Sequence, residues 1–322
     1  MLTPSPPNPH AAGARHATQP AGYTGAHPDT LFDAGWLALR AAADSAARAD
    51  ELNRRAADWL RSRRRAAGKD HPFLLTDLGA GSGANPRYLA ARLPGPQRWR
   101  LIDHDPALLA DALGACAELH DADGGRVEVE AHRSDLAALS AAALGEANLV
   151  CASALLDLVD AAWLARLADL CAALRCAVLV TLSVDGQWRF EGPGDVAEDA
   201  DNAFVRDAFN AHQRRDKGLG AALGPDAAPA LAAALDARGF EVELAPSPWR
   251  LDLAEAGDAA LARALIDGWR DAACAQCPHA AARIENWHGR RSAHCAASVG
   301  RLVVGHLDLF AAPGATLTSD AR

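Results

Sequence analysis

Short apolar runs alternate with stretches of helical spacing through the middle of the chain. The apolar runs have the length and continuous hydrophobic character of strands that are buried on both faces. Strands that alternate with helical patterns favour a parallel sheet with helices on both faces, so the pattern predicts an α/β fold with a doubly wound sheet. The predicted parallel strands occupy residues 73–77, 98–103, 126–130, 147–152 and 176–183.

Two more strands are predicted near the C-terminal end, at Phe240–Leu244 and Arg301–Phe310. Residues 184–239 lie between the fifth and sixth predicted strands, and a second insertion separates the sixth from the seventh. The second insertion has helical spacing, with Leu261, Leu265, Ile266 and Trp269 on one predicted face. The sequence leaves open how the last two strands pair.

The first predicted strand runs into an unusual loop. Residues Phe73 to Gly83 read FLLTDLGAGSG, with glycine at every second position of the loop. Glycines let the backbone turn sharply and approach a ligand closely, and such loops hold nucleotides at the carboxyl end of the first strand. The stretch also fits the dinucleotide pattern, but the carboxylate of Asp77 would repel a pyrophosphate. The same carboxylate suits a ligand with no phosphate and a cationic amino-acid tail.

The stretch Asp77-x-Gly79-x-Gly81-x-Gly83 resembles motif I of the class I S-adenosylmethionine-dependent methyltransferases. That resemblance implies a seven-stranded Rossmann-like sheet whose last strand is antiparallel, and S-adenosylmethionine as the cofactor. Asp103 ends the second predicted strand and would accept hydrogen bonds from both ribose hydroxyls. Asp135 matches the position that meets the adenine amino group. The other cofactor-binding positions that the resemblance implies are Ala80, His104, Ser134 and Ser153.

Composition and the resemblance together divide the chain. Residues 1–28, rich in proline, glycine and alanine, are predicted to be a disordered tail, and residues 29–70 a helical cap. Residues 71–183 would form the cofactor-binding core and 184–239 an acceptor-site or lid segment. Residues 240–315 would supply the C-terminal strands with the helical insertion. Arg40 in the cap has two interpretations, a contact to substrate or to the methionine carboxylate, and a solvated helix charge.

Residues 201–217 are predicted to form a helix with an apolar face and a separate polar stripe, ended by Gly218 and Gly220. The segment follows the fifth strand, whose carboxyl end borders the transferable methyl group in the family. We therefore expect it to line the acceptor site, and the alternative is a solvated surface helix. The candidate catalytic residues are His212, Asp216 and Lys217, and the candidate substrate-binding residues are Asp157, Asn210, Gln213 and Arg214.

Composition narrows the class of partner. The net charge is −9, which disfavours a nucleic-acid binder, and no apolar stretch is long enough for a membrane span. Seven cysteines without framework spacing fit a reducing compartment, so a cytoplasmic protein is expected. Cys274, Cys277 and His279 have zinc-like spacing, but His294 and Cys295 are adjacent rather than spaced, so free cysteines are the preferred interpretation and no metal is expected.

The sequence thus predicts an S-adenosylmethionine-dependent methyltransferase acting on a small-molecule acceptor. Three other interpretations stay open: a protein or RNA methyltransferase, a non-catalytic cofactor-binding subunit, and an NAD-dependent reductase. The acceptor atom and the oligomeric state are not specified by the sequence.

Overall fold

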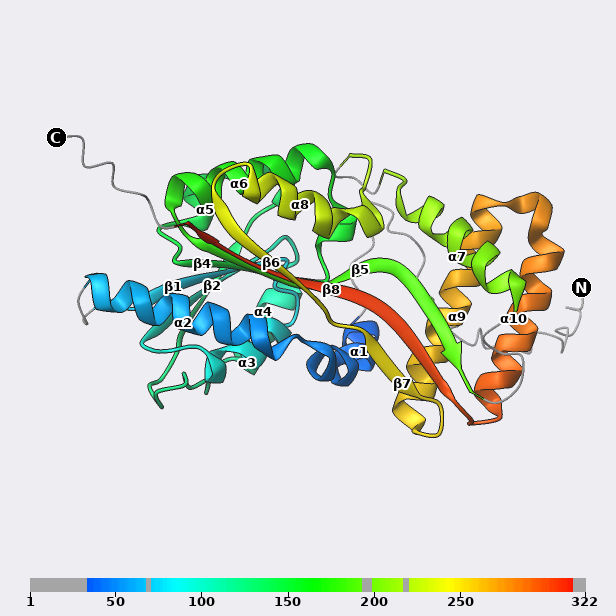
Figure 1. Cartoon of the computed structure of the whole chain (residues 1–322). Coiled ribbons are helices and arrows are strands. Elements are labelled where there is room, and N and C mark those ends of the chain that lie inside the picture. Colours follow the sequence, from blue (N-terminus) through cyan, green and yellow to red (C-terminus); the bar gives the residue numbers. More distant parts are fainter. Residues whose placement is uncertain (1–33, 68–70, 193–198, 217–219, 315–322) are drawn as a thin grey trace, which may run out of the picture.

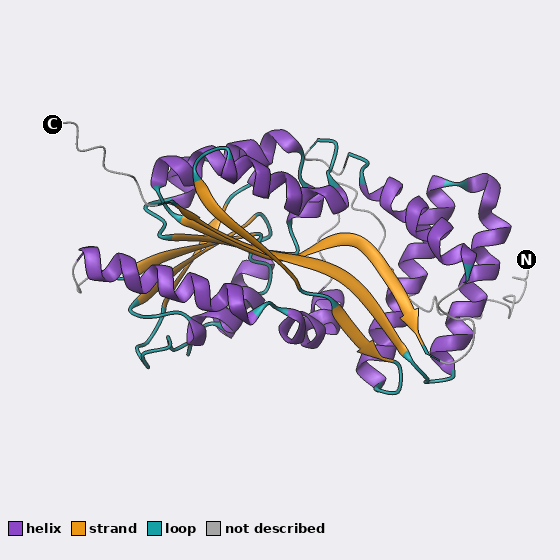
Figure 2. Ribbon diagram, in the orientation of Figure 1, coloured by secondary structure: helices purple, strands orange, loops and turns teal. Residues whose placement is uncertain are grey.

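The computed structural model describes residues 34–67, 71–192, 199–216 and 220–314, and the predicted N-terminal tail lies outside them. A twisted central sheet carries helices on both faces, and long strands lead from it to a group of helices at one end (Figures 1 and 2). Among the described helices, none combines the length and hydropathy needed to traverse a bilayer.

Five parallel strands form the first part of the sheet, in the order β3-β2-β1-β4-β5. They are β1 (Phe73–Leu78), β2 (Gln97–Asp103), β3 (Glu128–Arg133), β4 (Leu149–Ser153) and β5 (Ala177–Glu191). Strand β8 (Arg301–Pro313) lies antiparallel between β5 and β6 (Phe240–Pro246), which answers the open question of how the last strands pair. The predicted fold class is therefore confirmed, with the doubly wound order 3-2-1-4-5 and one reversed strand.

Three details of the sheet differ from the sequence prediction. The described residues contain eight strands rather than seven, because the short β7 (Trp249–Asp252) pairs with β8. Strand β3 begins at Glu128 instead of Arg126, since Arg126 forms an isolated bridge with His120. Strand β5 continues to Glu191, well past the predicted end at residue 183, because β8 provides a partner over that whole length.

Two hydrophobic layers cover the sheet. Helices α6 (Ala161–Leu174) and α8 (Ala227–Asp236) pack on one face with the short α5 (Ala141–Leu144). Helices α2 (Asp50–Ala67), α3 (Ala84–Leu89) and α4 (Pro106–Ala115) pack on the other. Asp105 accepts hydrogen bonds from the amides of Ala107 and Leu108 at the start of α4, as predicted for a helix opened by Asp-Pro.

A third hydrophobic cluster lies on the part of the sheet that extends beyond the parallel strands. The second half of β5 and the first half of β8 run together with β7, and helices α7 (Ala200–Gln213), α9 (Ala256–Gln276) and α10 (Ala281–Ala296) pack beside them (Figure 1). The four apolar residues predicted to share a helical face in the second insertion are all buried on α9. This extension holds one wall of the pocket described below.

One buried carboxylate joins three segments at the centre of the molecule. Asp308 on β8 is fully buried. Its Oδ1 accepts hydrogen bonds from the amide of Leu182 (2.7 Å) and the hydroxyl of Ser247 (2.6 Å). Its Oδ2 accepts one from the amide of Ala49 (2.9 Å), between α1 (Ala34–Ala47) and α2. Asp308 thereby fixes the helical cap, a bend in β5 and the connection from β6 to β7 relative to one another.

Asp308→Asn is expected to lower the free energy of unfolding by at least about 2 kcal/mol, because the amide NH₂ group faces a donor that the carboxylate had satisfied. Urea unfolding measures the loss. Asp236→Asn, at an exposed position of α8, is the matched control. Equal destabilisation by the two variants would contradict the role assigned to Asp308.

Candidate functional site

The glycine loop after β1 closely approaches its neighbours. Gly79, Gly81 and Gly83 have φ angles of 64°, 51° and 76°, in the region that favours glycine. A Cβ on Gly83 would lie 3.0 Å from Sγ of Cys116 and 3.2 Å from Cβ of Ala112 in α4. The loop therefore packs so closely on α4 that a side chain at Gly83 would be crowded.

Asp103 at the end of β2 supports this loop. Its Oδ2 accepts a hydrogen bond from the amide of Gly81 (2.9 Å), and its Oδ1 accepts one from the amide of Asp105 (3.0 Å). The amide of Ala80 donates to the carbonyl of Ile102, so the loop and β2 are joined at two points. Each carboxylate oxygen keeps a further lone pair for a ligand.

The other predicted cofactor residues also gather at this edge. The amide of Ser134 donates to the carbonyl of Asp103, which brings the end of β3 beside the end of β2. Asp135 is exposed and accepts a hydrogen bond from the amide of Ala137. His104 is largely exposed, with Nδ1 3.3 Å from Oδ1 of Asp103.

A buried polar chain runs from Asp77 to the helical cap. The side-chain amide of Asn85 donates to Oδ1 of Asp77 (2.6 Å). Arg48, in the joint between α1 and α2, donates to Oδ1 of Asn85 and to the hydroxyl of Ser153 (3.2 Å). Its guanidinium also lies 4.5 Å from the ring centre of Tyr88. Arg48 was not among the residues chosen from the sequence, because nothing in its local pattern distinguishes it from the other arginines.

Two atoms in this series of hydrogen-bonded polar residues have no hydrogen-bond partner among the described residues. Oδ2 of Asp77 and Nε of Arg48 are both fully buried, and one is an acceptor and the other a donor. Burial raises the pKa of Asp77 to about 7, although the hydrogen bond from Asn85 and the charge of Arg48 act in the opposite direction. An amino-acid zwitterion, with one ammonium and one carboxylate, complements the unused acceptor and the unused donor.

A largely apolar pocket is connected to the glycine loop through α1, which contributes side chains to both. Leu37 of α1 is the side chain nearest to the Cβ position of Gly81, at 3.7 Å. Trp36 and Arg40 of the same helix line the pocket. Ala154 and Asp157, in the loop that follows β4, line it from the sheet. The pocket and the loop therefore share the same helix and the same edge of the sheet.

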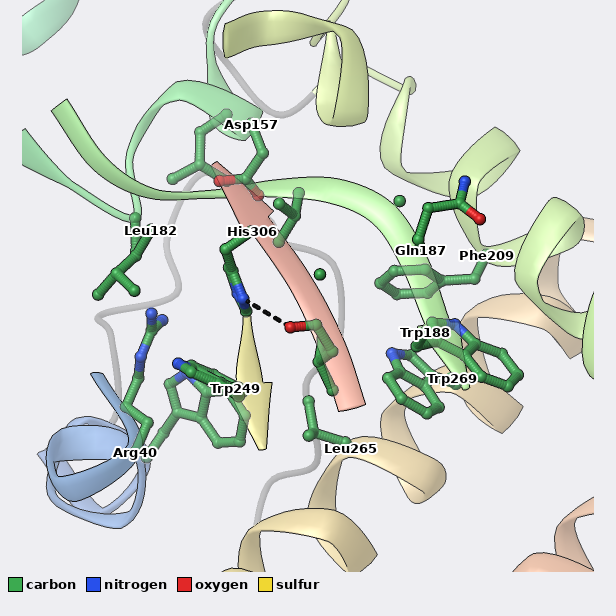
Figure 3. Close-up of a pocket in the computed structure, with 17 residues that line it drawn as sticks. Arg40, Asp157, Leu182, Gln187, Trp188, Phe209, Trp249, Leu265, Trp269 and His306 are labelled. Atoms are coloured by element: carbon green, nitrogen blue, oxygen red, sulfur yellow. Dashed lines mark hydrogen bonds between the residues drawn. The ribbon is translucent and has the colours of Figure 1, made fainter. Parts of the chain in front are cut away.

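Figure 3 shows the groups that surround this pocket. Arg40 and Trp249 lie on one side, and Trp188, Trp269 and Phe209 lie on the opposite side. Arg40 is paired with Asp44 (2.8 Å), and its guanidinium lies 5.0 Å from the ring centre of Trp249.

The polar residues predicted on the segment after β5 lie away from the pocket, and only Phe209 of α7 lines it. Asn210 donates to the carbonyl of Gly186 (2.9 Å), where the pairing of β5 with β8 is irregular. Arg214 forms an ion pair with Asp226 (2.7 Å) at an exposed position. His212 and Gln213 are not among the pocket residues either.

The end of this segment also differs from the prediction. Helix α7 ends at Gln213 instead of continuing to residue 217. Asp216 is exposed beyond it and forms an isolated bridge with Ala221. Lys217 lies outside the described residues. Of the predicted substrate-binding residues, Asp157 alone lines the pocket.

The part of the chain that the structure describes contains no group of three or more His, Cys, Asp and Glu side chains placed to hold a metal ion. Cys274 and Cys277 are free, half-buried thiols at the end of α9.

The raised pKa of Asp77 predicts a pH-dependent stability. The folded state holds this proton more tightly than the unfolded chain, whose aspartates titrate near about 3.9. The protonated form of Asp77 therefore adds its full contribution to the free energy of unfolding below about pH 4. This contribution, at most about 4 kcal/mol, is lost as the pH rises through about 7. Asp77→Asn is expected to remove this part of the slope in urea unfolding between about pH 5 and pH 8. Identical slopes for the variant and the wild type would contradict the burial of an ionisable Asp77.

Comparison with known proteins gives structural matches only. No protein-family model matches the chain, and no curated protein matches its sequence. One similar structure is magnesium protoporphyrin IX methyltransferase from Synechocystis with bound S-adenosylmethionine, at 15% identity, covering 61% of this chain and 74% of that chain with a TM-score of 0.32. Another is the cyclopropane synthase MmaA2 from Mycobacterium tuberculosis, at 9% identity, covering 74% and 78% with a TM-score of 0.38.

A third is a methyltransferase from Geobacter sulfurreducens in complex with S-adenosyl-L-homocysteine, at 16% identity, covering 85% of this chain and 97% of that chain with a TM-score of 0.38. The fold assignment comes from the strand order of the sheet, β3-β2-β1-β4-β5-β8-β6, with β8 antiparallel to both of its neighbours. The chain has a doubly wound Rossmann-like fold, which is the fold that the resemblance of its glycine loop implies.

Proposed function

We propose that this protein is an S-adenosylmethionine-dependent methyltransferase whose acceptor is a small molecule. The observation that carries the proposal is the pair of unused buried atoms on Asp77 and Arg48 beside the glycine loop. They complement the zwitterionic tail of S-adenosylmethionine, while Asp103 offers lone pairs to the ribose hydroxyls. When bound, the cofactor supplies an activated methyl group on sulfur, so the protein mainly has to align the acceptor and exclude water.

The pocket beside α1 is the proposed acceptor site. It is lined mainly by apolar and aromatic side chains with a few polar groups, as small-molecule sites usually are. Asp157 is the carboxylate that we assign as the base for an acceptor whose nucleophile carries a proton. The catalytic candidates from the sequence, His212, Asp216 and Lys217, stay candidates, although neither His212 nor Asp216 lines the pocket.

Two alternatives are less well supported. A protein or RNA methyltransferase would favour a basic surface around the cofactor, whereas the chain carries a net charge of −9. A non-catalytic subunit would have no need for a pocket that reaches the same sheet edge as the glycine loop. An NAD-dependent reductase is opposed by Asp77, whose buried carboxylate would face a pyrophosphate.

A thermal-shift comparison tests the choice of cofactor. S-adenosylhomocysteine at a hundred times its dissociation constant is expected to stabilise the protein by about 2.7 kcal/mol, and NAD and NADP are expected to leave the melting temperature unchanged. Stabilisation by NAD or NADP alone would support the reductase instead.

Asp103→Ala is expected to weaken the binding of S-adenosylhomocysteine by at least tenfold, since hydrogen bonds to a charged group contribute about 1.5–3 kcal/mol each. The variant also removes the bond that holds the amide of Gly81. Isothermal titration calorimetry measures the affinity, and Asp111→Ala, at an exposed position of α4, is the control. Unchanged affinity in Asp103→Ala would show that the ribose is bound elsewhere.

Arg48 is expected to recognise the carboxylate of the amino-acid tail. The test compares S-adenosylhomocysteine with 5′-methylthioadenosine, which lacks that tail. In the wild type the first should bind more tightly, and Arg48→Met should reduce the ratio of the two affinities by about tenfold, because one charge-assisted hydrogen bond is lost. Arg55→Met, an exposed residue of α2, should leave the ratio unchanged. An unchanged ratio in Arg48→Met would place the tail away from Arg48.

A further inference from the structure

Aromatic side chains are concentrated in the pocket to an unusual degree. Aromatic residues make up only 5% of the chain, yet four of its eight tryptophans line this one pocket. Trp36, Trp188, Trp249 and Trp269 come from α1, β5, β7 and α9. Trp188 and Trp269 are stacked with ring centres 4.4 Å apart, and Phe209 meets Trp269 edge-on. Walls of this kind offer flat π-faces to a ligand.

His306 on β8 contributes one polar atom to the same pocket. The residue is only 2% exposed. Its Nδ1 donates to the carbonyl of Val304 at 3.1 Å, so Nε2 carries the lone pair. Nε2 has no hydrogen-bond partner among the described residues. Because Nε2 is also not among their fully buried unpartnered atoms, it borders the pocket that His306 lines. It is therefore an acceptor that is available to a ligand.

The charge around His306 decides what kind of donor fits. Burial first, and then the positive charge of Arg40, hold the pKa of His306 at about 3, so the imidazole is neutral at physiological pH. Arg40 lies over Trp249, whose ring centre is 4.6 Å from that of His306. The guanidinium of Arg40 is partly offset by Asp44, but its charge still disfavours the protonated form of the imidazole. A cationic ligand group at Nε2 would be disfavoured in the same way. The carboxylate of Asp157 lines the same pocket and acts in the opposite direction, so the test below includes a cationic probe.

We propose that the pocket binds a flat, uncharged aromatic molecule that carries a hydroxyl or N–H group, with the ring against the tryptophan side chains and the polar hydrogen donated to Nε2 of His306. The proposal rests on the proposed function, in that this molecule is the methyl acceptor. His306 is then a positioning residue, which sets the orientation of the acceptor relative to the glycine loop.

The test measures binding to the full-length protein by isothermal titration calorimetry, without a methyl donor and again with saturating S-adenosylhomocysteine. Three probes are compared. 2-Naphthol has an aromatic ring and a hydroxyl donor, its methyl ether 2-methoxynaphthalene has the same ring without the donor, and phenyltrimethylammonium is an aromatic cation. The wild type is expected to bind 2-naphthol about tenfold more tightly than its ether, the effect of one hydrogen bond to a buried acceptor. Phenyltrimethylammonium is expected to bind most weakly.

His306→Phe keeps an aromatic ring but removes the acceptor. In this variant 2-naphthol and its ether should bind equally, while the affinity for the ether stays near the wild-type value. His279→Phe, at an exposed position outside the pocket, should keep the tenfold preference. If His306→Phe fails to fold, the comparison of the three probes on the wild type still decides the proposal.

Equal binding of 2-naphthol and its ether to the wild type, tightest binding of the cation, or no binding of any probe would each overturn the proposal. So would a naphthol preference that survives in a folded His306→Phe variant. These outcomes are separate from the fate of the proposed function. If S-adenosylhomocysteine binds and naphthol does not, the methyltransferase assignment stands and the aromatic ligand is ruled out. If naphthol binds and S-adenosylhomocysteine does not, the aromatic ligand stands and the methyltransferase assignment fails.

Discussion

The carboxylate of Asp308 accepts three hydrogen bonds from three separate segments, and both halves of the proposed site depend on where those segments meet. Ala49 is the neighbour of Arg48, which donates to Asn85 just after the glycine loop. Leu182 lines the aromatic pocket in a left-handed conformation (φ 57°) that costs about 1–2 kcal/mol for a residue with a side chain. Ser247 lies just before β7, which carries Trp249. One buried group therefore sets the positions of the cofactor side and the acceptor side together.

Burying such groups has a cost in stability that the rest of the fold has to offset. Asp77 and Arg48 both lie within the molecule, each with an atom that has no partner among the described residues. Burial raises the pKa of Asp77 and lowers that of Arg48, so in each case the charged form is destabilised. Groups of this kind occur mainly at functional sites, where a ligand of complementary charge compensates for the lost water. The two hydrophobic layers on the sheet stabilise the fold and offset the cost of burying these charged groups.

Local patterns in the sequence were enough for the parallel sheet and the glycine loop. Continuous apolar runs mark buried strands wherever they occur, and the spacing of Gly79, Gly81 and Gly83 is a feature of one short segment. The residues that the sequence missed are placed by contacts over long distances in the chain. Arg48 is hydrogen-bonded to Ser153, and Asp308 to the amide of Ala49. No local periodicity in the sequence predicts either pair. Of the polar residues predicted on α7, Asn210 donates to the carbonyl of Gly186 within β5, a role that depends on the unforeseen length of that strand.

The central claim is that the methyl donor binds at the carboxyl edge of the parallel strands, next to the aromatic pocket. Amide hydrogen exchange with and without S-adenosylhomocysteine tests it most directly, because it reports on each backbone segment separately. The account predicts slower exchange in residues 79–83, 103–105 and 153–157 on binding, with no change in α10. Binding that leaves these three segments unchanged, or that protects α10 instead, would contradict it.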